Sequence, residues 1–127
     1  MLLVLLLAAC DSYTQVGSST TSDMGPNGGS LHTKIGKANG TSEQSIETES
    51  SGGLILEADV TLSVGKGIFK IELLGEDDAV TLTLEASDGQ TVSGQGQMVA
   101  DAFGEANYRV TATEAENVEY TIEYTFR

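Results

Sequence analysis

The strongest constraint on the fold of this chain is the alternation of apolar and polar residues that begins at residue 54. A period of two places alternate side chains on the same face of a β-strand, so the apolar members should face a common core. No part of this region has a convincing helical period. The inward positions fall into five runs: Leu54, Leu56, Ala58, Val60, Leu62 and Val64; Phe69, Ile71 and Leu73; Val80, Leu82, Leu84 and Ala86; Ala106, Tyr108, Val110 and Ala112; and Val118, Tyr120, Ile122, Tyr124 and Phe126.

Short turn-forming segments separate these runs. Glycine-containing turns are expected at residues 65–67 and 75–78, and Asp88-Gly89 predicts a tight hairpin because both residues tolerate the positive φ of such turns. Connections this short exclude parallel neighbours, which need long crossovers. The strands should therefore pair antiparallel.

A sixth, weaker strand is expected over residues 91–100, where Gly94 and Gly96 interrupt the alternation. Six strands that each have one apolar face require two packed sheets or a closed barrel. We predict an all-β fold, a small antiparallel β-sandwich of jelly-roll or immunoglobulin-like type, over residues 52–127.

Residues 10–51 have a different composition, rich in Ser, Thr, Gly and Asn. Such a segment buries little apolar surface, so it is expected to form a flexible polar linker, disordered for the most part and with an end-to-end distance of roughly 35 Å. Two short runs, residues 31–35 and 45–48, could add an edge strand to the sandwich.

The N-terminus carries an unbroken apolar run, residues 2–9, directly before the single cysteine, Cys10. A run of this length is too short for a membrane-spanning helix, which takes about 20 residues, and is typical of a secretory signal. The sequence Leu7-Ala8-Ala9-Cys10 resembles the lipobox of bacterial lipoproteins. The resemblance implies that residues 1–9 are a signal peptide, that cleavage falls between Ala9 and Cys10, and that the thiol carries the lipid. The protein would then be lipid-anchored and extracytoplasmic, at the cell membrane or the outer envelope surface.

The C-terminal stretch, residues 104–126, is similar to the end of bacterial pre-peptidase C-terminal domains. Gly104 and Tyr108 match the glycine and aromatic residue that open one strand in that family, and Tyr120, Ile122 and Tyr124 match its closing aromatic strand. The resemblance implies a small jelly-roll sandwich on a secreted protein.

The charge balance limits the partners of the folded part. Six Lys and Arg residues stand against nineteen Asp and Glu residues, a formal net charge of −13. Nucleic-acid binding draws much of its strength from basic side chains that neutralise phosphates, so no nucleic-acid partner is expected.

Carboxylates are the only abundant reactive groups. Glu76, Asp77 and Asp78 place three of them in one turn, and such oxygen ligands suit Ca²⁺, although the spacing is not that of an EF-hand. The alternatives are a calcium site and an ordinary acidic turn. No other cofactor is expected.

No catalytic residues are expected. The one histidine, His32, falls in the predicted linker, where it cannot serve as the positioned base of a Ser or Cys nucleophile. One histidine and one cysteine also exclude a zinc site built from these residues. The tyrosines of the last two runs are in phase with apolar residues, which indicates core positions rather than an exposed platform for sugars.

These features together predict a non-enzymatic membrane lipoprotein. Its sandwich would serve in envelope structure or dock another envelope protein. The alternative is a jelly-roll module that binds a carbohydrate or another small ligand.

Overall fold

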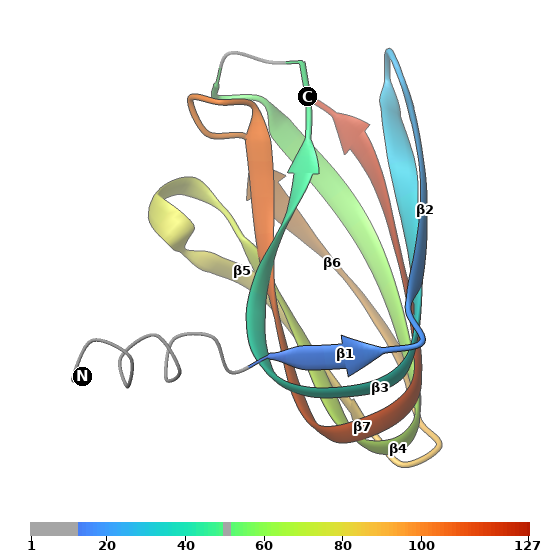
Figure 1. Ribbon diagram of the computed structural model, residues 1–127. Coiled ribbons are helices and arrows are strands. Elements are labelled where there is room, and N and C mark those ends of the chain that lie inside the picture. Colours follow the sequence, from blue (N-terminus) through green and yellow to red (C-terminus); the bar gives the residue numbers. More distant parts are fainter. Residues whose placement is uncertain (1–12, 50–51) are drawn as a thin grey trace, which may run out of the picture.

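The computed structural model describes residues 13–49 and 52–127 and contains an antiparallel β-sandwich (Figure 1). Every strand pairing is antiparallel, which confirms the expected fold class. None of the described residues belongs to a helix with the length and apolar character needed to cross a membrane. The elements are β1 (Thr14–Val16), β2 (Ser19–Gly25), β3 (Gly28–Glu47), β4 (Ile55–Leu74), the short 3-10 turn η1 (Glu76–Asp78), β5 (Val80–Ser87), β6 (Thr91–Val99) and β7 (Glu105–Phe126).

Three long strands, β3, β4 and β7, run through both layers of the sandwich. Each bends near its middle, so its two halves lie in different layers (Figure 1). We call these layers the first leaf, with strand order β2-β3-β7-β4-β6, and the second leaf, with order β1-β3-β7-β4-β5. The leaves are therefore one continuous sheet folded over, and their apolar faces meet.

The bend in β4 lies where the sequence predicted a turn. Residues 65–67 do not reverse the chain; they form an irregularity at which the register against β7 shifts between Lys66 and Ile68. Gly67 has a φ of +80°, and a Cβ there would lie 2.1 Å from the carbonyl oxygen of Glu114. The expectation of two separate strands is thus wrong for β4, and equally for β7, whose bend contains Glu114 and Asn117 at positive φ. Alternation marks the inward face of a strand but does not show whether an irregularity bends the strand or ends it.

The turn at Asp88-Gly89 is present, but it does not close a hairpin. It joins β5, which pairs with the second half of β4, to β6, which pairs with the first half. Gly67 donates its N–H to the Asp88 carboxylate at 2.6 Å, and Gly89 donates its N–H to the Val64 carbonyl at 2.8 Å. The turn therefore braces the bend of β4.

The linker prediction is wrong for the described residues before position 50. This segment contains β1, β2 and β3, and β3 pairs with β7 through both leaves. Few of its side chains enter the core, chiefly Ile35, Ala38 and Ile46. Because β3 is held largely by backbone hydrogen bonds, the polar composition of this segment gave little sign of a strand. The described part of the sandwich therefore includes β1 from Thr14 onward, rather than starting at residue 52. Of the two short runs expected to add an edge strand, residues 31–35 lie between β2 and β7 in the first leaf, whereas residues 45–47 do lie at an edge of the second leaf.

The core lies between the leaves and uses the predicted inward residues. Val80 is the exception, with 46% of its surface exposed, while Leu54, Leu82 and Phe126 are partly buried. The fully buried set includes Leu56, Val60, Leu62, Val64, Phe69, Ile71, Leu73, Val110, Val118 and Ile122.

A pair of buried tyrosines ties the two leaves together. Tyr108 and Tyr120 stand on opposite halves of β7, and their hydroxyl oxygens lie 3.0 Å apart across the core. Phe69 stacks on Tyr120 with ring centroids 5.9 Å apart. Burial raises the pKa of both tyrosines. Their placement confirms that these aromatic side chains are core residues.

Candidate functional site

The outer face of the first leaf is mainly polar, because its strands alternate between core and solvent. Register aligns its outward residues in rows that cross all five strands. One row runs Asp23, Ser30, Glu123, Asp59 and Gln95, and the next contains Thr125, Glu57 and Gln97. These rows bring together residues from every strand of the leaf.

A hollow of about 760 Å³, which we call the first-leaf groove, lies over these two rows. The groove presents both hydrogen-bond acceptors and hydrogen-bond donors. Its polar lining comprises four carboxylates and two amides: Asp23, Glu57, Asp59, Glu123, Gln95 and Gln97. Glycines at the β2–β3 turn also line it and leave the backbone accessible there.

These glycines hold the turn close to β7. Gly28 has a φ of +147°, and a Cβ there would lie 2.1 Å from the carbonyl oxygen of Tyr124. A Cβ on Gly29 would lie 2.2 Å from the carbonyl oxygen of Asp23. Only glycine permits this approach, so the shape of this end of the groove depends on both positions.

Tyr124 borders the groove, but it is an inward residue of β7 that is only 4% exposed and packs beside Phe126 in the core. Burial, and secondarily the Asp23 carboxylate, raise the pKa of its hydroxyl. The hydrogen-bonding groups of the groove are therefore its carboxylates and amides rather than this hydroxyl.

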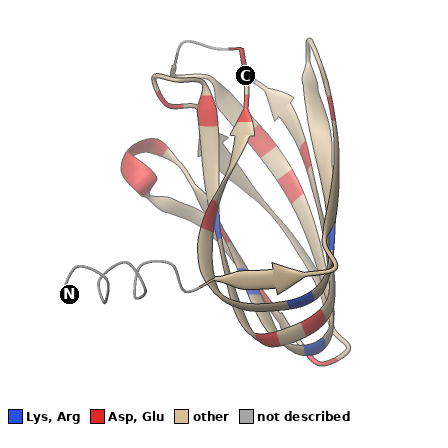
Figure 2. Ribbon diagram, in the orientation of Figure 1, with Lys and Arg blue, Asp and Glu red and all other residues tan. Residues whose placement is uncertain are grey.

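Two carboxylates at the centre of the groove lack cationic partners. Asp59 and Glu123 are direct cross-strand neighbours on the same face, an arrangement that destabilises a sheet. Among the described residues, neither side chain has an ion pair or a hydrogen bond, whereas the adjacent Glu57 pairs with Arg127. Figure 2 shows acidic residues on the upper part of β4, while several basic residues lie near the bends of the long strands at the bottom of the view. The groove thus concentrates uncompensated negative charge.

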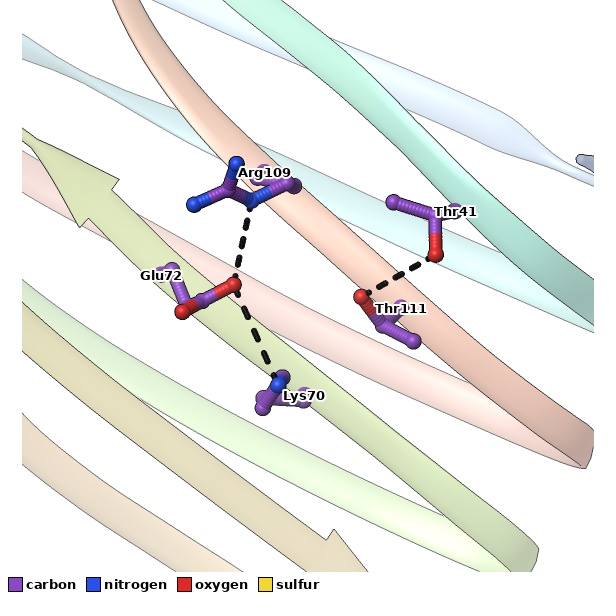
Figure 3. Close-up of polar contacts among 5 residues, drawn as sticks. All are labelled: Thr41, Lys70, Glu72, Arg109 and Thr111. Atoms are coloured by element: carbon purple, nitrogen blue, oxygen red, sulfur yellow. Dashed lines mark hydrogen bonds and ion pairs between the residues drawn. The ribbon is translucent and has the colours of Figure 1, made fainter. Parts of the chain in front are cut away.

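The outer face of the second leaf is organised differently. Glu72 accepts a hydrogen bond from Arg109 Nε at 3.1 Å and lies 4.0 Å from Lys70 Nζ (Figure 3). Thr41 and Thr111 face each other beside this group, with their hydroxyl oxygens 3.4 Å apart. Here the carboxylate is neutralised by neighbours within the sheet.

The histidine does not lie on a mobile segment. His32 is in β3 on the outer face of the first leaf, and its Nε2 lies 2.6 Å from Oε2 of Glu119. It is a surface residue, and its predicted place in a flexible linker is wrong.

The acidic turn lies where the sequence predicted it, but its carboxylates are not arranged to hold a metal ion. Glu76, Asp77 and Asp78 form the exposed turn η1. Within residues 13–49 and 52–127, no three or more His, Cys, Asp or Glu side chains form a group that could hold a metal ion. A calcium site at this turn stays a prediction. The predicted cleavage and lipidation residues, Ala9 and Cys10, lie outside the described residues.

Sequence reasoning missed the groove for two reasons. Glu57 and Asp59 fell on an outward strand face, where charges are usually solvated. Asp23 and Ser30 fell in the segment assigned to the linker. The meeting of Asp59 with Glu123 depends on the pairing of β4 with β7, which no local pattern reveals. A predicted strand with two carboxylates on one face was the only available signal.

No protein-family model and no curated protein matches this chain. Solved structures resemble it in fold at low identity. One is of Bacillus endospore appendages, described as disulfide-linked pili, with 16% identity, a TM-score of 0.45 and coverage of 88% of this chain and 93% of that chain. Another is a carbohydrate-binding module of Cellvibrio mixtus lichenase 5A in complex with cellotriose, with 14% identity, a TM-score of 0.38 and coverage of 88% of each chain.

A third structure is a xylan-binding domain of Paenibacillus barcinonensis Xyn10C. It is 15% identical, with a TM-score of 0.38 and coverage of 91% of this chain and 84% of that chain. Likeness at this level concerns the β architecture only and assigns no ligand to this protein.

Proposed function

We propose that this protein is a non-enzymatic binding module whose first-leaf groove takes a polyhydroxylated ligand, a saccharide that is uncharged or carries amino groups. The observation that carries the proposal is the unpartnered pair Asp59 and Glu123 at the centre of a groove that also offers two amides. Carboxylates accept hydrogen bonds from hydroxyls, and the amides both donate and accept. Such bonds to a charged acceptor are stronger than neutral ones.

The charge of the groove selects among saccharides. Asp23, Glu57, Asp59 and Glu123 repel uronic acids and phosphorylated glycans, and the net charge of −13 extends this repulsion over the whole protein. An ammonium group of an amino sugar would instead replace the missing cation between Asp59 and Glu123. We therefore rank amino-sugar oligomers above neutral ones and neutral ones above acidic ones.

A binding role fits the placement of the carboxylates better than glycoside hydrolysis does. Hydrolases of the common type hold their two carboxyl groups on either side of the scissile bond. Here Glu57, Asp59 and Glu123 rise from adjacent strands of one sheet face. A ligand lying on this face would meet them all from the same side.

The proposal includes anchoring through Cys10. Only residues 11–12 separate this cysteine from Tyr13, which packs against the core. Three residue steps reach at most about 10 Å, so a lipid on Cys10 would hold the sandwich next to the membrane rather than on a long tether. Fractionation of the wild type and Cys10→Ser tests this part: the variant should leave the membrane fraction, and retention equal to the wild type would contradict the anchor.

Calorimetric titration with a glucosamine tetrasaccharide tests the groove. The double variant Asp59→Asn/Glu123→Gln should bind at least about tenfold more weakly, because it loses two charge-assisted acceptors while keeping the side-chain shapes. Glu72→Gln, on the other leaf, is the matched control and should bind like the wild type.

The same titration with N-acetylglucosamine and galacturonic acid tetrasaccharides tests the charge ranking. Weaker binding of the first and none of the second is expected. Failure of the wild type to bind both glucosamine forms, or equal weakening by Glu72→Gln, would contradict the groove. Appearance of new reducing ends during incubation would contradict the non-enzymatic role.

A further inference from the structure

One edge of the second leaf is open over seven residues of β3, which we call the β3 edge, residues 41–47. On this side β1 pairs only with Lys37, Ala38 and Asn39. On the other side β7 pairs with residues 40–47 without a further register shift. No described strand continues beyond β1 along the β3 edge. A regular strand with one unpaired side is a template for another strand.

The hydrogen-bond pattern identifies the backbone groups that are open. The N–H of Thr48 donates to the Gly104 carbonyl, on the side of β7, at 2.7 Å. Backbone groups alternate in direction along a strand, so even-numbered residues point their N–H and C=O towards β7. The outward groups therefore belong to the odd-numbered residues Thr41, Glu43, Ser45 and Glu47.

This edge is firmly held, unlike the open side of β2. Ile46 is in the core with 5% of its surface exposed, and Ser45 donates its hydroxyl to the Asn107 amide oxygen at 2.7 Å. Every residue of β2 is exposed. Among the other described edges, β1 offers only three residues, and β5 and β6 are in contact with each other. The β3 edge is the described edge best able to receive a strand without moving.

The charges along the edge indicate what kind of strand fits. Glu43 and Glu47 point outward from it, and Glu105 lies opposite Glu47 on β7. Arg109 lies opposite Glu43, but its Nε donates to Glu72. Two copies of the edge paired antiparallel about residue 45 would place each Glu43 against a Glu47 of the other copy, which is unfavourable. A strand with basic side chains at those positions would be attracted.

We propose that the β3 edge docks an extended, basic segment of another protein by strand addition. The outward N–H and C=O groups supply backbone hydrogen bonds, and Glu43 and Glu47 select lysine or arginine at alternate positions of the partner. This site is on the other leaf from the groove and is independent of it.

The test uses full-length protein and a capped heptapeptide of alternating lysine and valine, measured by fluorescence anisotropy. Three related peptides define the mode of binding. One has glutamate in place of lysine. The other two are lysine-valine peptides with N-methyl groups on alternate backbone nitrogens: one is methylated at the odd-numbered residues and the other at the even-numbered residues. The lysine-valine peptide should bind, the glutamate-valine peptide should not, and one methylated form should lose at least about tenfold because it cannot donate to the edge. Equal binding of all three lysine peptides would reduce the interaction to charge alone and overturn the proposal.

Two protein variants locate the site. Glu43→Pro removes an outward N–H, which an edge strand tolerates, and should weaken peptide binding at least about tenfold, whereas Glu43→Gln removes only the charge and should weaken it less. Asp59→Asn should have no effect. Wild-type affinity in a folded Glu43→Pro variant would overturn the proposal.

Amide hydrogen exchange and sedimentation of the free protein show whether the chain itself or a second copy already covers the β3 edge. Fast exchange at Glu43, Ser45 and Glu47 that slows on adding peptide supports the open edge. Slow exchange before peptide is added, whether in a monomer or in a dimer, means that the chain itself or a second copy covers the edge and overturns the proposal.

Discussion

The two leaves share three strands, yet their outer faces treat charge in opposite ways. On the second leaf, Glu72 is only 17% exposed at its side chain and is held between Arg109 and Lys70. On the first leaf, Asp59 and Glu123 are neighbours without a described cationic partner. The first arrangement stabilises the sheet, and the second costs stability while leaving hydrogen-bonding capacity open. This difference is the reason for placing the ligand on the first leaf.

The largest expected effect comes from breaking the bend that lets the leaves share strands. Gly67→Ala should lower the free energy of unfolding by about 3 kcal/mol or more, because its Cβ would collide with the Glu114 carbonyl at a positive φ. Gly89→Ala is the matched control: φ is +74°, but nothing lies within 4 Å of the added Cβ, so only about 1 kcal/mol should be lost. Urea unfolding measures both. Equal losses of stability in the two variants would mean that the bend in β4 does not depend on the close contact between Gly67 and Glu114.

Alkaline pH should loosen the contact between the leaves. Burial raises the pKa of Tyr108 and Tyr120 in the folded state, so above about pH 10 the unfolded chain loses protons that the folded chain keeps. Stability is then present below pH 10 and lost as pH rises, by at most about 1.4 kcal/mol per tyrosine by pH 11. Tyr13, whose pKa burial raises to about 12, should add to the loss.

Urea unfolding at pH 8 and pH 11 measures this effect. The double variant Tyr108→Phe/Tyr120→Phe keeps both rings and should lose most of the pH dependence. The same loss of stability in this variant as in the wild type would assign the effect to other groups.

Removing the charge of Glu72, which Arg109 and Lys70 share on the second leaf, should have a smaller effect on stability. Glu72→Gln leaves Arg109 and Lys70 without their anion and should lower stability by about 1 kcal/mol, since both basic side chains are partly exposed. Thermal unfolding at low and at 1 M salt measures it, and the difference from the wild type should shrink with salt. An unchanged melting temperature at low salt would remove the contrast between the faces.

The smallest effect has the opposite sign. Asp59→Asn relieves the repulsion from Glu123 and should raise stability by about 0.3 to 0.5 kcal/mol. The same urea titration, made at pH 7 with Glu72→Gln alongside, compares the two faces directly. A loss of stability in Asp59→Asn would indicate a structural role for this carboxylate in the free protein.

Much of the fold could be predicted from local patterns. The apolar runs on β4 and β7 identified the strands and their inward faces, since side-chain direction depends only on the strand itself. The bend at Gly67 could not be distinguished from a turn, because both need a glycine between two alternating runs. Only two short runs within or at the end of β3, residues 31–35 and 45–48, were expected as strand, because the pairing of β3 with β7 depends on backbone groups that every sequence supplies.

The candidate site was less predictable than the fold. Its centre depends on a register that sets Asp59 beside Glu123, residues 64 positions apart in the chain. Cys10 is the reverse case, a local motif that gives a sharp expectation about location without any contribution from the sandwich. Local sequence thus identified strands and gives an expectation about processing, whereas the groove arises from tertiary pairing.

The most direct test of the central claim is to map backbone amide chemical shifts while the glucosamine tetrasaccharide is titrated into labelled protein. The largest shifts should fall on Asp59, Gln95 and Glu123, with Glu72 and Thr111 unchanged. Shifts centred on the second leaf, or no shifts at millimolar saccharide, would contradict this claim.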